Sequence, residues 1–295
     1  MSGRLGFRLL ADLSRSPFAS HAELGRRLGV TGEAVRQRLD RFKEDGVLRG
    51  FSAIPAASVF GRRACDVVFQ SSVDLGLVLR QSDVVFAVTS ADGGCGVKGY
   101  VHDVLDFTSR MSDLVGGPPR QVISGPAPRP TNALGTIDLR VLRALVVEPR
   151  SSFRHLQAAT GLSYRTVRSR RERLLESRAV DVQPILRPSR NGDLYHNLWI
   201  EGPLCANEQE VLDLLHDHVV LDRWDTPPSI YLFCHEDGIK AHIAMIEKLR
   251  RTPGIDQVEV VLSEEYRMAK DRVLGWIDEL MAAWRGKEPS GTGQD

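Results

Sequence analysis

Hydrophobic positions near the start of the chain recur at the spacing of α-helices. Residues 4–13 carry four leucines at positions that share one helical face, and Pro17 ends this predicted helix. The segment 20–23, Ser-His-Ala-Glu, is a capping box, so a second helix begins there. Gly29 readily takes the left-handed conformation that closes a helix. The pattern therefore predicts two short helices before residue 30.

A third helix and a strand follow at once. Thr31 can cap a helix that turns Val35, Leu39 and Phe42 inward and ends near residue 46. Residues 47–54 then alternate in polarity, which is typical of a short strand. A helix, a tight turn, a second helix and a strand in this order predict a winged helix-turn-helix.

The same pattern occurs a second time. Residues 6–48 align with residues 138–180 under a constant shift of 132 and without gaps, so the chain contains two copies of one helical module. One core position disagrees, because Arg171 stands where the first copy has Leu39. The aligned identities are Arg8/Arg140, Leu10/Leu142, Leu13/Leu145, Pro17/Pro149, Ser20/Ser152, Leu24/Leu156, Gly29/Gly161, Val35/Val167, Arg36/Arg168, Arg38/Arg170, Arg41/Arg173 and Glu44/Glu176.

Each module is followed by alternating strand and helix patterns in the order βαββαβ, which predicts a ferredoxin-like sandwich. In the first half the predicted segments are 65–70, 72–80, 83–90, 95–101, 103–115 and 120–124. In the second half they are 194–200, 207–218, 219–225, 229–235, 238–251 and 256–262. A final helix over about 264–285 places apolar side chains along one side, as a docking or dimerising element or as a cap on the core.

The predicted fold class is α+β, with two winged helix-turn-helix domains alternating with two ferredoxin-like domains. The expected divisions are 1–60 and 135–188 for the helical modules, 64–125 and 192–263 for the sandwiches, 126–134 for a linker, 264–286 for the C-terminal amphipathic helix and 287–295 for a disordered tail.

Charge follows the same division of the chain. Residues 1–63 carry 12 Lys and Arg against 6 Asp and Glu, and residues 135–190 carry 12 against 5. The other two stretches are acidic, with 5 against 7 over 64–134 and 10 against 20 over 191–295. Basic modules that alternate with acidic ones indicate that the modules meet a polyanion and the sandwiches do not.

The third helix of each module carries the candidate DNA-binding residues. If position 35 faces the core, steps of 100° bring polar and basic side chains to the outer face. Arginine can bind guanine or phosphate and glutamine can bind adenine in the major groove. Because the third helix of the second module has fewer acidic residues than that of the first, the second module is expected to contribute more affinity for DNA phosphates. The candidates are Thr31, Glu33, Arg36, Gln37, Arg41, Ser163, Arg165, Arg168, Ser169 and Arg173, whereas Arg38 and Arg170 are expected to be structural.

Composition points to an ordinary globular protein. No stretch has the roughly 20 apolar residues of a membrane helix, and the N-terminus has no apolar run of the secretory kind, so a cytoplasmic location is expected. The four cysteines form no Cys-x-x-Cys pair, which favours buried thiols over disulfides or zinc. We expect neither a metal nor a cofactor.

The run RLLADLSRSPFASHAELGRRLGVTGEAVRQRLDRFKEDGVLRGFSAI, followed by βαββαβ, resembles the Lrp/AsnC (feast/famine) family of transcriptional regulators, and the whole plan occurs twice. The resemblance implies a sequence-specific transcription regulator that binds double-stranded DNA, a homodimeric assembly and a sensing domain that often binds amino acids. The family's effector-binding turn corresponds here to 89–94, with Ser90, Asp92, Gly93 and Gly94 as candidates. The corresponding turn of the second half, 225–229, departs from that pattern.

Three alternatives stay open. The same two-domain plan resembles siroheme decarboxylases, whose histidine and aromatic residues would correspond to Tyr100, His102, Arg223, Trp224, Tyr231 and His235. A metal could be held by His216 and His218 with Cys234 and His235. One of the two helix-turn-helix copies could instead serve as a protein-contact module. The arginine surplus on the third helices favours the DNA-binding regulator over all three.

Overall fold

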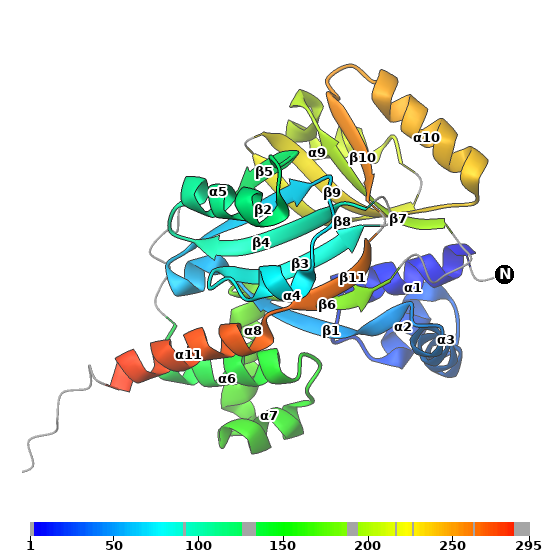
Figure 1. Ribbon diagram of the computed structural model, residues 1–295. Coiled ribbons are helices and arrows are strands. Elements are labelled where there is room, and N and C mark those ends of the chain that lie inside the picture. The colour runs from blue at the N-terminus through cyan, green and yellow to red at the C-terminus, as the bar shows by residue number, and fades with distance from the viewer. Residues whose placement is uncertain are drawn as a thin grey trace, which may run out of the picture.

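The computed structural model describes residues 3–90, 93–125, 134–187, 194–215, 217–225, 227–261 and 263–285. Figure 1 shows the two helical modules below the two mixed helix-and-sheet domains, with a two-stranded ribbon between the modules. Residues 126–133 of the predicted linker 126–134, and the predicted tail over 287–295, lie outside the described residues.

The first module has the three helices and the strand that the pattern predicts. They are α1 (Gly3–Arg15), α2 (His21–Leu28), α3 (Gly32–Glu44) and β1 (Leu48–Pro55). Ser20 and Thr31 accept hydrogen bonds from backbone N–H groups one turn later, and Gly29 ends α2 with a φ of 70°. These caps satisfy groups that the helix ends would leave unpaired. Glu23 pairs with Arg27, so only the serine half of the predicted capping box forms.

The second module repeats this plan with α6 (Thr136–Val147), α7 (Phe153–Thr160), α8 (Tyr164–Glu176) and β6 (Val180–Leu186). Ser152 caps α7, Ser163 caps α8 and Gly161 closes α7 with a φ of 65°. The local signals that the repeat shares therefore produce the same backbone twice.

The wings of the two modules form one sheet. Strand β1 pairs with β6 in antiparallel register, with Ala53 opposite Val182. Each wing supplies the hydrogen-bonding edge that the other needs, so neither strand is left as an open edge on that side. The two modules are therefore joined by backbone hydrogen bonds within one chain.

The first ferredoxin-like domain follows a 3-10 turn at Ala57–Phe60. Its elements are β2 (Arg63–Phe69), α4 (Leu75–Leu79), β3 (Val84–Ser90), β4 (Cys95–Val101), α5 (Val104–Val115) and β5 (Gln121–Ser124). The strands lie in the order β3-β4-β2-β5, which confirms the predicted topology. Phe107 and Met111 of α5 are fully buried against one face of this sheet.

The second domain has the same strand order, β10-β7-β9-β8. Its elements are β7 (Leu194–Glu201), a 3-10 turn (Pro203–Ala206), α9 (Glu208–Leu212), β8 (Asp217–Asp225), β9 (Pro228–Glu236), α10 (Ile239–Arg251) and β10 (Gln257–Val261). The predicted helix over 207–218 is shorter than expected, because residues from 217 onward pair with β9.

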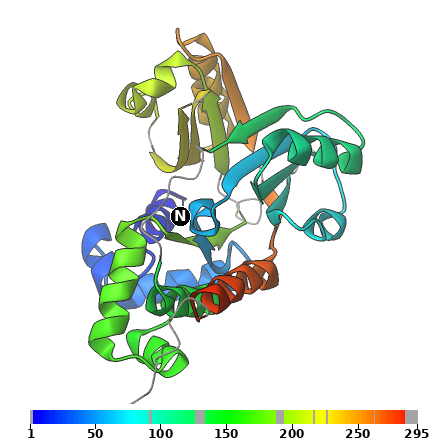
Figure 2. The ribbon, with the colours of Figure 1, turned by 90° about the vertical axis from the view of Figure 1, so that its left-hand side faces the viewer.

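The C-terminal segment departs from prediction. Residues expected to begin a helix at 264 form a strand, β11 (Ser263–Met268), which pairs with β3 and extends the first sheet to five strands. The aromatic rings of Tyr266 and Phe86 pack across this pair with centroids 4.3 Å apart. Pairing with the open edge of β3 stabilises residues 263–268 more than the helix that their pattern predicts. The helix begins only with α11 (Lys270–Arg285). Both views place α11 alongside α6 (Figure 1, Figure 2), so its apolar side is buried within the chain.

The first helix of the N-terminal half also packs on the ferredoxin-like domain of the C-terminal half. Helix α1 packs on β8 and β9 of the second sandwich, and the ring of Phe7 lies 5.2 Å from that of Phe233. The hydroxyl of Tyr195 in β7 donates to the carbonyl oxygen of Gly3, 3.0 Å away. The first module thus belongs to the same hydrophobic core as the second sandwich.

Candidate DNA-binding surface

The outer faces of α3 and α8 are those that helical geometry predicts. Val35 and Val167 are buried, and all ten candidate DNA-binding residues are exposed. The hydroxyls of Thr31 and Ser163 accept the N-cap hydrogen bonds of their helices. The structure therefore gathers the candidates into two separate polar faces, one on each module.

Helix α3 carries a network of ion pairs along its exposed side. Arg36 lies 2.6 Å from one oxygen of Glu33 and 2.9 Å from Asp40, which also pairs with Lys43. Gln37 donates to Glu33 as well. These hydrogen bonds, Arg36 first, lower the pKa of Glu33 to about 2, and the same partner raises the pKa of Arg36. Arg36 and Gln37 are therefore oriented before any ligand arrives.

Two further arginines of α3 have no such partners. Arg38 and Arg41 form no ion pair with any residue that the structure describes, and Arg41 is exposed. Their charges are thus available to a phosphate or a base edge without first breaking a contact.

Helix α8 uses its arginines differently. Arg168 pairs with Glu172 at 2.9 Å, and this hydrogen bond raises the pKa of Arg168. Arg170 and Arg173 both reach Asp138 of α6, each at 3.4 Å. The carboxylate of Asp138 is only 3 % exposed and also accepts from the backbone N–H of Gly135. Arg170 is thus structural, as expected, and Arg173 is partly held within the module.

Arg171 explains the one position at which the repeat disagrees. Its guanidinium lies 3.8 Å from the ring centroid of Phe153 and 4.3 Å from that of Phe18, which belongs to the first module. Burial lowers the pKa of Arg171. Arg150 makes a similar contact with the ring of Phe51 and donates to the carbonyl of Ala19. A cation and the aromatic ring on which it stacks attract each other. The side chain of Arg171 therefore links the two modules instead of packing into the core of one of them.

The sequence pattern overestimates the free positive charge of the second module. Four of the five arginines of α8 already contact other residues of the protein, which leaves Arg165 as the exposed arginine of α8 without an ion pair among described residues. The role of Asp138 as a buried partner of two arginines was not predicted, because its aligned residue, Gly6, carries no side chain. The signal that could have revealed it is the change from glycine to aspartate at an aligned position where the two copies differ.

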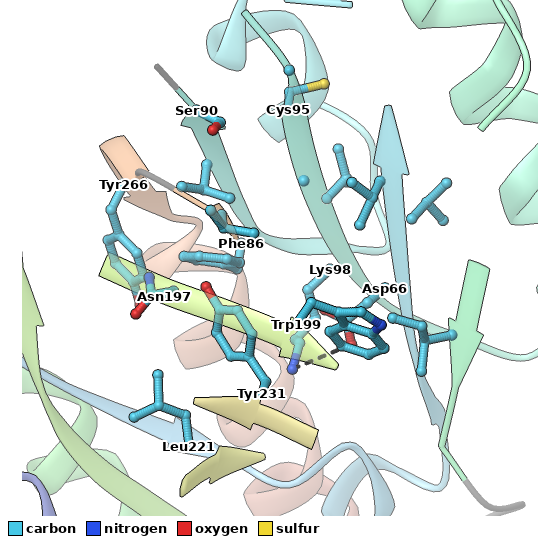
Figure 3. Close-up of a pocket in the computed structure, with 18 of the residues that line it drawn as sticks. Asp66, Phe86, Ser90, Cys95, Lys98, Asn197, Trp199, Leu221, Tyr231 and Tyr266 are labelled. Atoms are coloured by element: carbon cyan, nitrogen blue, oxygen red, sulfur yellow. Dashed lines mark ion pairs between the residues drawn. The ribbon is translucent and has the colours of Figure 1, made fainter. Parts of the chain in front are cut away.

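Two of the four effector-turn candidates lie beside a cavity between the two sheets. Ser90 and Gly94 line this cavity of about 490 Å³, and Figure 3 shows Ser90 at one end of it. Gly93 is described, with a φ of 85°, but does not line the cavity. Asp92 lies outside the described residues.

Only half of the six residues of the decarboxylase alternative reach one common cavity. Tyr100 is buried and donates its hydroxyl to the carbonyl of Pro55, 2.5 Å away, whereas His102 is exposed. His235 is buried beside Phe7, and Arg223 pairs with Glu208. Only the aromatic members Tyr100, Trp224 and Tyr231 line the cavity between the sheets.

The thiols and histidines show no reactive arrangement among described residues. All four cysteines are buried and free, as expected, and burial raises the pKa of Cys95 and Cys205 to about 11. Within the described part of the chain no three metal-ligating side chains gather, and His216 falls outside it. None of the described helices is long and apolar enough to cross a membrane.

Comparison with known proteins agrees with the duplicated modules. The model of winged helix-turn-helix DNA-binding domains matches residues 4–49 and again 134–179. An uncharacterized HTH-type transcriptional regulator of Pyrococcus abyssi is 25 % identical over 116 residues, which cover 36 % of this chain and 75 % of that protein.

Two solved structures overlap with the chain at low identity. The siroheme decarboxylase NirDL covers 95 % of this chain and 99 % of its own, with 12 % identity and a TM-score of 0.47. An AsnC family transcriptional regulator from Agrobacterium tumefaciens covers 41 % of this chain and 87 % of its own, with 20 % identity and a TM-score of 0.29. At these scores neither structure assigns an activity to the chain.

The family model matches both modules, and the Pyrococcus abyssi regulator is similar to part of the chain. Each module is followed by the ferredoxin-like domain that the resemblance implies. The chain therefore carries two winged helix-turn-helix DNA-binding modules, and part of its sequence is similar to HTH-type transcriptional regulators.

Proposed function

We propose that this regulator binds a specific double-stranded DNA site with α3 and α8 together. The observation that carries the proposal is the β1–β6 ribbon, which holds two capped, exposed helices in one fixed unit. A single-copy regulator needs two chains to present two such helices, whereas one chain does so here. Because the faces of α3 and α8 differ in sequence, we expect the two half-sites to differ as well.

The exposed residues divide by the contacts they can make. Arg41 and Arg165 carry charges without ion-pair partners in the described part of the chain, so we assign them phosphate or guanine contacts. Gln37 and Ser169 each lie six residues after the cap of their helix, nearly two turns along it, and can read base edges. Thr31 and Ser163 lie at the helix N-termini, where backbone N–H groups favour a phosphate. The remaining candidates would change the strength of these DNA contacts, because each already forms an ion pair within the protein. They are Glu33, Arg36, Arg168 and Arg173.

We also propose that a small-molecule effector controls DNA binding. Ser90 and Gly94, from the turn that the family resemblance assigns to effectors, line the cavity between the sandwiches. The resemblance suggests an amino acid as the effector class, whereas the charges in the wall of this cavity are already paired and do not favour a zwitterion there. A dimer of this chain remains a prediction, to be measured by analytical ultracentrifugation.

The proposal is tested by selecting bound duplexes from a random library and measuring affinity against salt for the selected site. We expect the double variant Arg41→Ala/Arg165→Ala to bind at least about tenfold more weakly, because each lost charge contact costs about 1 kcal/mol or more. Arg251→Ala, an exposed arginine on α10, is the matched control and should bind like the unmodified protein.

Two outcomes would overturn the proposal. Selection could return no enriched sequence at low ionic strength. Alternatively, the double variant could bind as tightly as the Arg251→Ala control, which would place the DNA contact elsewhere.

A further inference from the structure

A cavity of about 490 Å³ lies between the open faces of the two sandwich sheets. Its walls come from β2, β3, β4 and β11 on one side and from β7, β8, β9 and β10 on the other, and β6 of the wing ribbon also lines it. The volume falls within the range of roughly 300 to 1,000 Å³ that is typical of small-molecule sites. Figure 3 shows aromatic side chains from both sheets pointing into the same space.

Aromatic rings face each other across this cavity. Trp199 packs against Trp224 with centroids 4.6 Å apart and lies 6.2 Å from Tyr231. On the opposite sheet, Phe86 and Tyr266 form a second aromatic pair. A flat ring system inserted between these walls would gain stacking contacts on both sides, which are worth about 0.5–1.5 kcal/mol for each aromatic pair.

One polar group in the wall has no hydrogen-bond partner in the part of the chain that the structure describes. Trp199 is 6 % exposed, and its indole N–H finds no acceptor among the residues that the structure describes. An N–H group that is buried without an acceptor costs about 1–3 kcal/mol, and a bound molecule that accepts this hydrogen bond would recover it. The indole N–H therefore indicates an acceptor atom on the occupant.

The charges in the wall are matched within the protein. Lys98 pairs with Asp66 at 3.4 Å, a contact marked in Figure 3, and Arg120 pairs with Glu259 at 2.6 Å. Both cations thus have anions beside them before any ligand binds. A carboxylate or an ammonium group would have to break one of these pairs, since burying an unpaired charge is costly. An uncharged occupant meets no such penalty.

We propose that this cavity binds an uncharged, planar aromatic molecule that accepts a hydrogen bond from Trp199, and that its binding changes DNA affinity. The effect on DNA affinity rests on the proposed function, whereas binding to the cavity does not. The route is short, because Gln183, Pro184 and Ile185 of β6 line the cavity while the same strand pairs with β1 between the modules. A ligand that fits only one arrangement of the ribbon shifts the arrangement of α3 and α8.

Nile red is a suitable probe, because it is uncharged and planar, carries carbonyl and ring acceptor atoms, and emits more strongly in apolar surroundings. We expect saturable binding of one molecule per chain. Tyr231→Ala removes a ring from one wall and Val88→Trp fills space at the other, and each should weaken binding at least about tenfold. Trp199→Phe keeps a ring without the N–H and should weaken it about threefold or more. Trp284→Phe changes an exposed tryptophan of α11 away from the cavity and should have no effect.

Charge and coupling are tested in the same system. We expect anilinonaphthalene sulfonate and L-methionine to displace Nile red poorly, and saturating Nile red to change affinity for the selected DNA at least about fivefold. Circular dichroism of each variant shows whether its fold is retained, and Trp199→Phe replaces Tyr231→Ala or Val88→Trp if either variant is unfolded.

The site is wrong if Nile red does not saturate, or if the cavity variants bind it like Trp284→Phe. The ligand class is wrong if either charged probe competes with equal affinity. The coupling is wrong if DNA affinity is the same with and without saturating Nile red. Failure of DNA binding in the absence of any probe would instead count against the proposed function.

Discussion

The two helix-turn-helix modules share a backbone plan, and one of the aligned positions at which their first helices differ changes the contacts of both modules. Position 6 is glycine in the first module, and its equivalent in the second is Asp138. A Cβ atom at Gly6 would lie 2.8 Å from the hydroxyl oxygen of Tyr195, so the absence of a side chain lets the second sandwich approach α1. Asp138 instead turns a carboxylate towards Arg170 and Arg173 of its own module.

This difference changes how many arginines of each recognition helix, α3 or α8, are paired with a carboxylate of the first helix of the same module. In the first module, the arginines equivalent to Arg170 and Arg173 are Arg38 and Arg41, which have no carboxylate at position 6 to pair with. A single position therefore decides both how a module attaches to the rest of the chain and how much charge its recognition helix offers. The lesson is that an arginine surplus counted from sequence overstates the charge available to DNA.

The largest expected effect comes from removing the buried carboxylate. Asp138→Ala should lower the free energy of unfolding by about 2 kcal/mol, because two arginines and the Gly135 N–H lose their shared acceptor. Chemical denaturation measures this loss. Glu172→Ala, which removes an exposed partner of Arg168, is the matched control and should cost no more than about 0.5 kcal/mol. Similar losses in the two variants would contradict the comparison.

Gly6→Ala tests the other side of the same comparison. The added Cβ would crowd the Tyr195 hydroxyl, which is held by its hydrogen bond to Gly3, so we expect a loss of about 1 kcal/mol despite the better helix propensity of alanine. Gly275→Ala in α11 meets no atom within 4 Å and should instead stabilise the protein slightly. Thermal unfolding of both variants would detect the opposite signs, and a stabilised Gly6→Ala variant would refute the close approach.

The modules should also differ in their dependence on salt. Arg41→Ala should reduce the slope of log affinity against log salt by about 1, whereas Arg173→Ala should reduce it by about half as much, because Asp138 already pairs with Arg173. Fluorescence anisotropy titrations with the selected duplex provide the slopes. An equal or larger loss for Arg173→Ala would show that the buried carboxylate does not hold that arginine away from DNA.

The smallest effect concerns Glu33. Because its pKa is lower in the folded protein than its ordinary value of 4.5, ionised Glu33 favours the folded state above pH 4.5, and this contribution disappears as the pH falls towards 2. A carbon-detected NMR titration of the carboxyl group should have its midpoint near 2. In Arg36→Ala the midpoint should rise towards the ordinary value. A normal midpoint in the unmodified protein would show that the Arg36 pair does not persist in solution.

Local signals in the sequence predicted the modules well. The caps at Ser20, Thr31, Ser152 and Ser163 form as expected, since each depends only on residues within one helical turn. The strand orders of both sandwiches also follow from the βαββαβ pattern. The candidate DNA-binding residues lie on exposed faces, and their role stays a prediction.

Contacts between distant segments could not be predicted in this way. The strand at 263–268 exists because β3 offers an open edge nearly two hundred residues earlier in the chain. Arg171 conflicts with its own helix pattern until Phe18 of the other module is placed beside it. The inter-sheet cavity likewise needs two sheets whose mutual orientation no local pattern encodes.

The register of the wing ribbon has a consequence for the DNA site that we propose the protein to bind. Under the shift of 132, the pair Ala53–Val182 corresponds to the pair Gly50–Ile185, and the two pairs between them exchange in the same way. These four central pairs of the ladder therefore map onto one another when the modules are swapped, so a local two-fold axis runs through the middle of this stretch. Recognition helices related by such an axis meet the two DNA strands in opposite directions, and we expect the operator to be an imperfect inverted repeat and not a direct one.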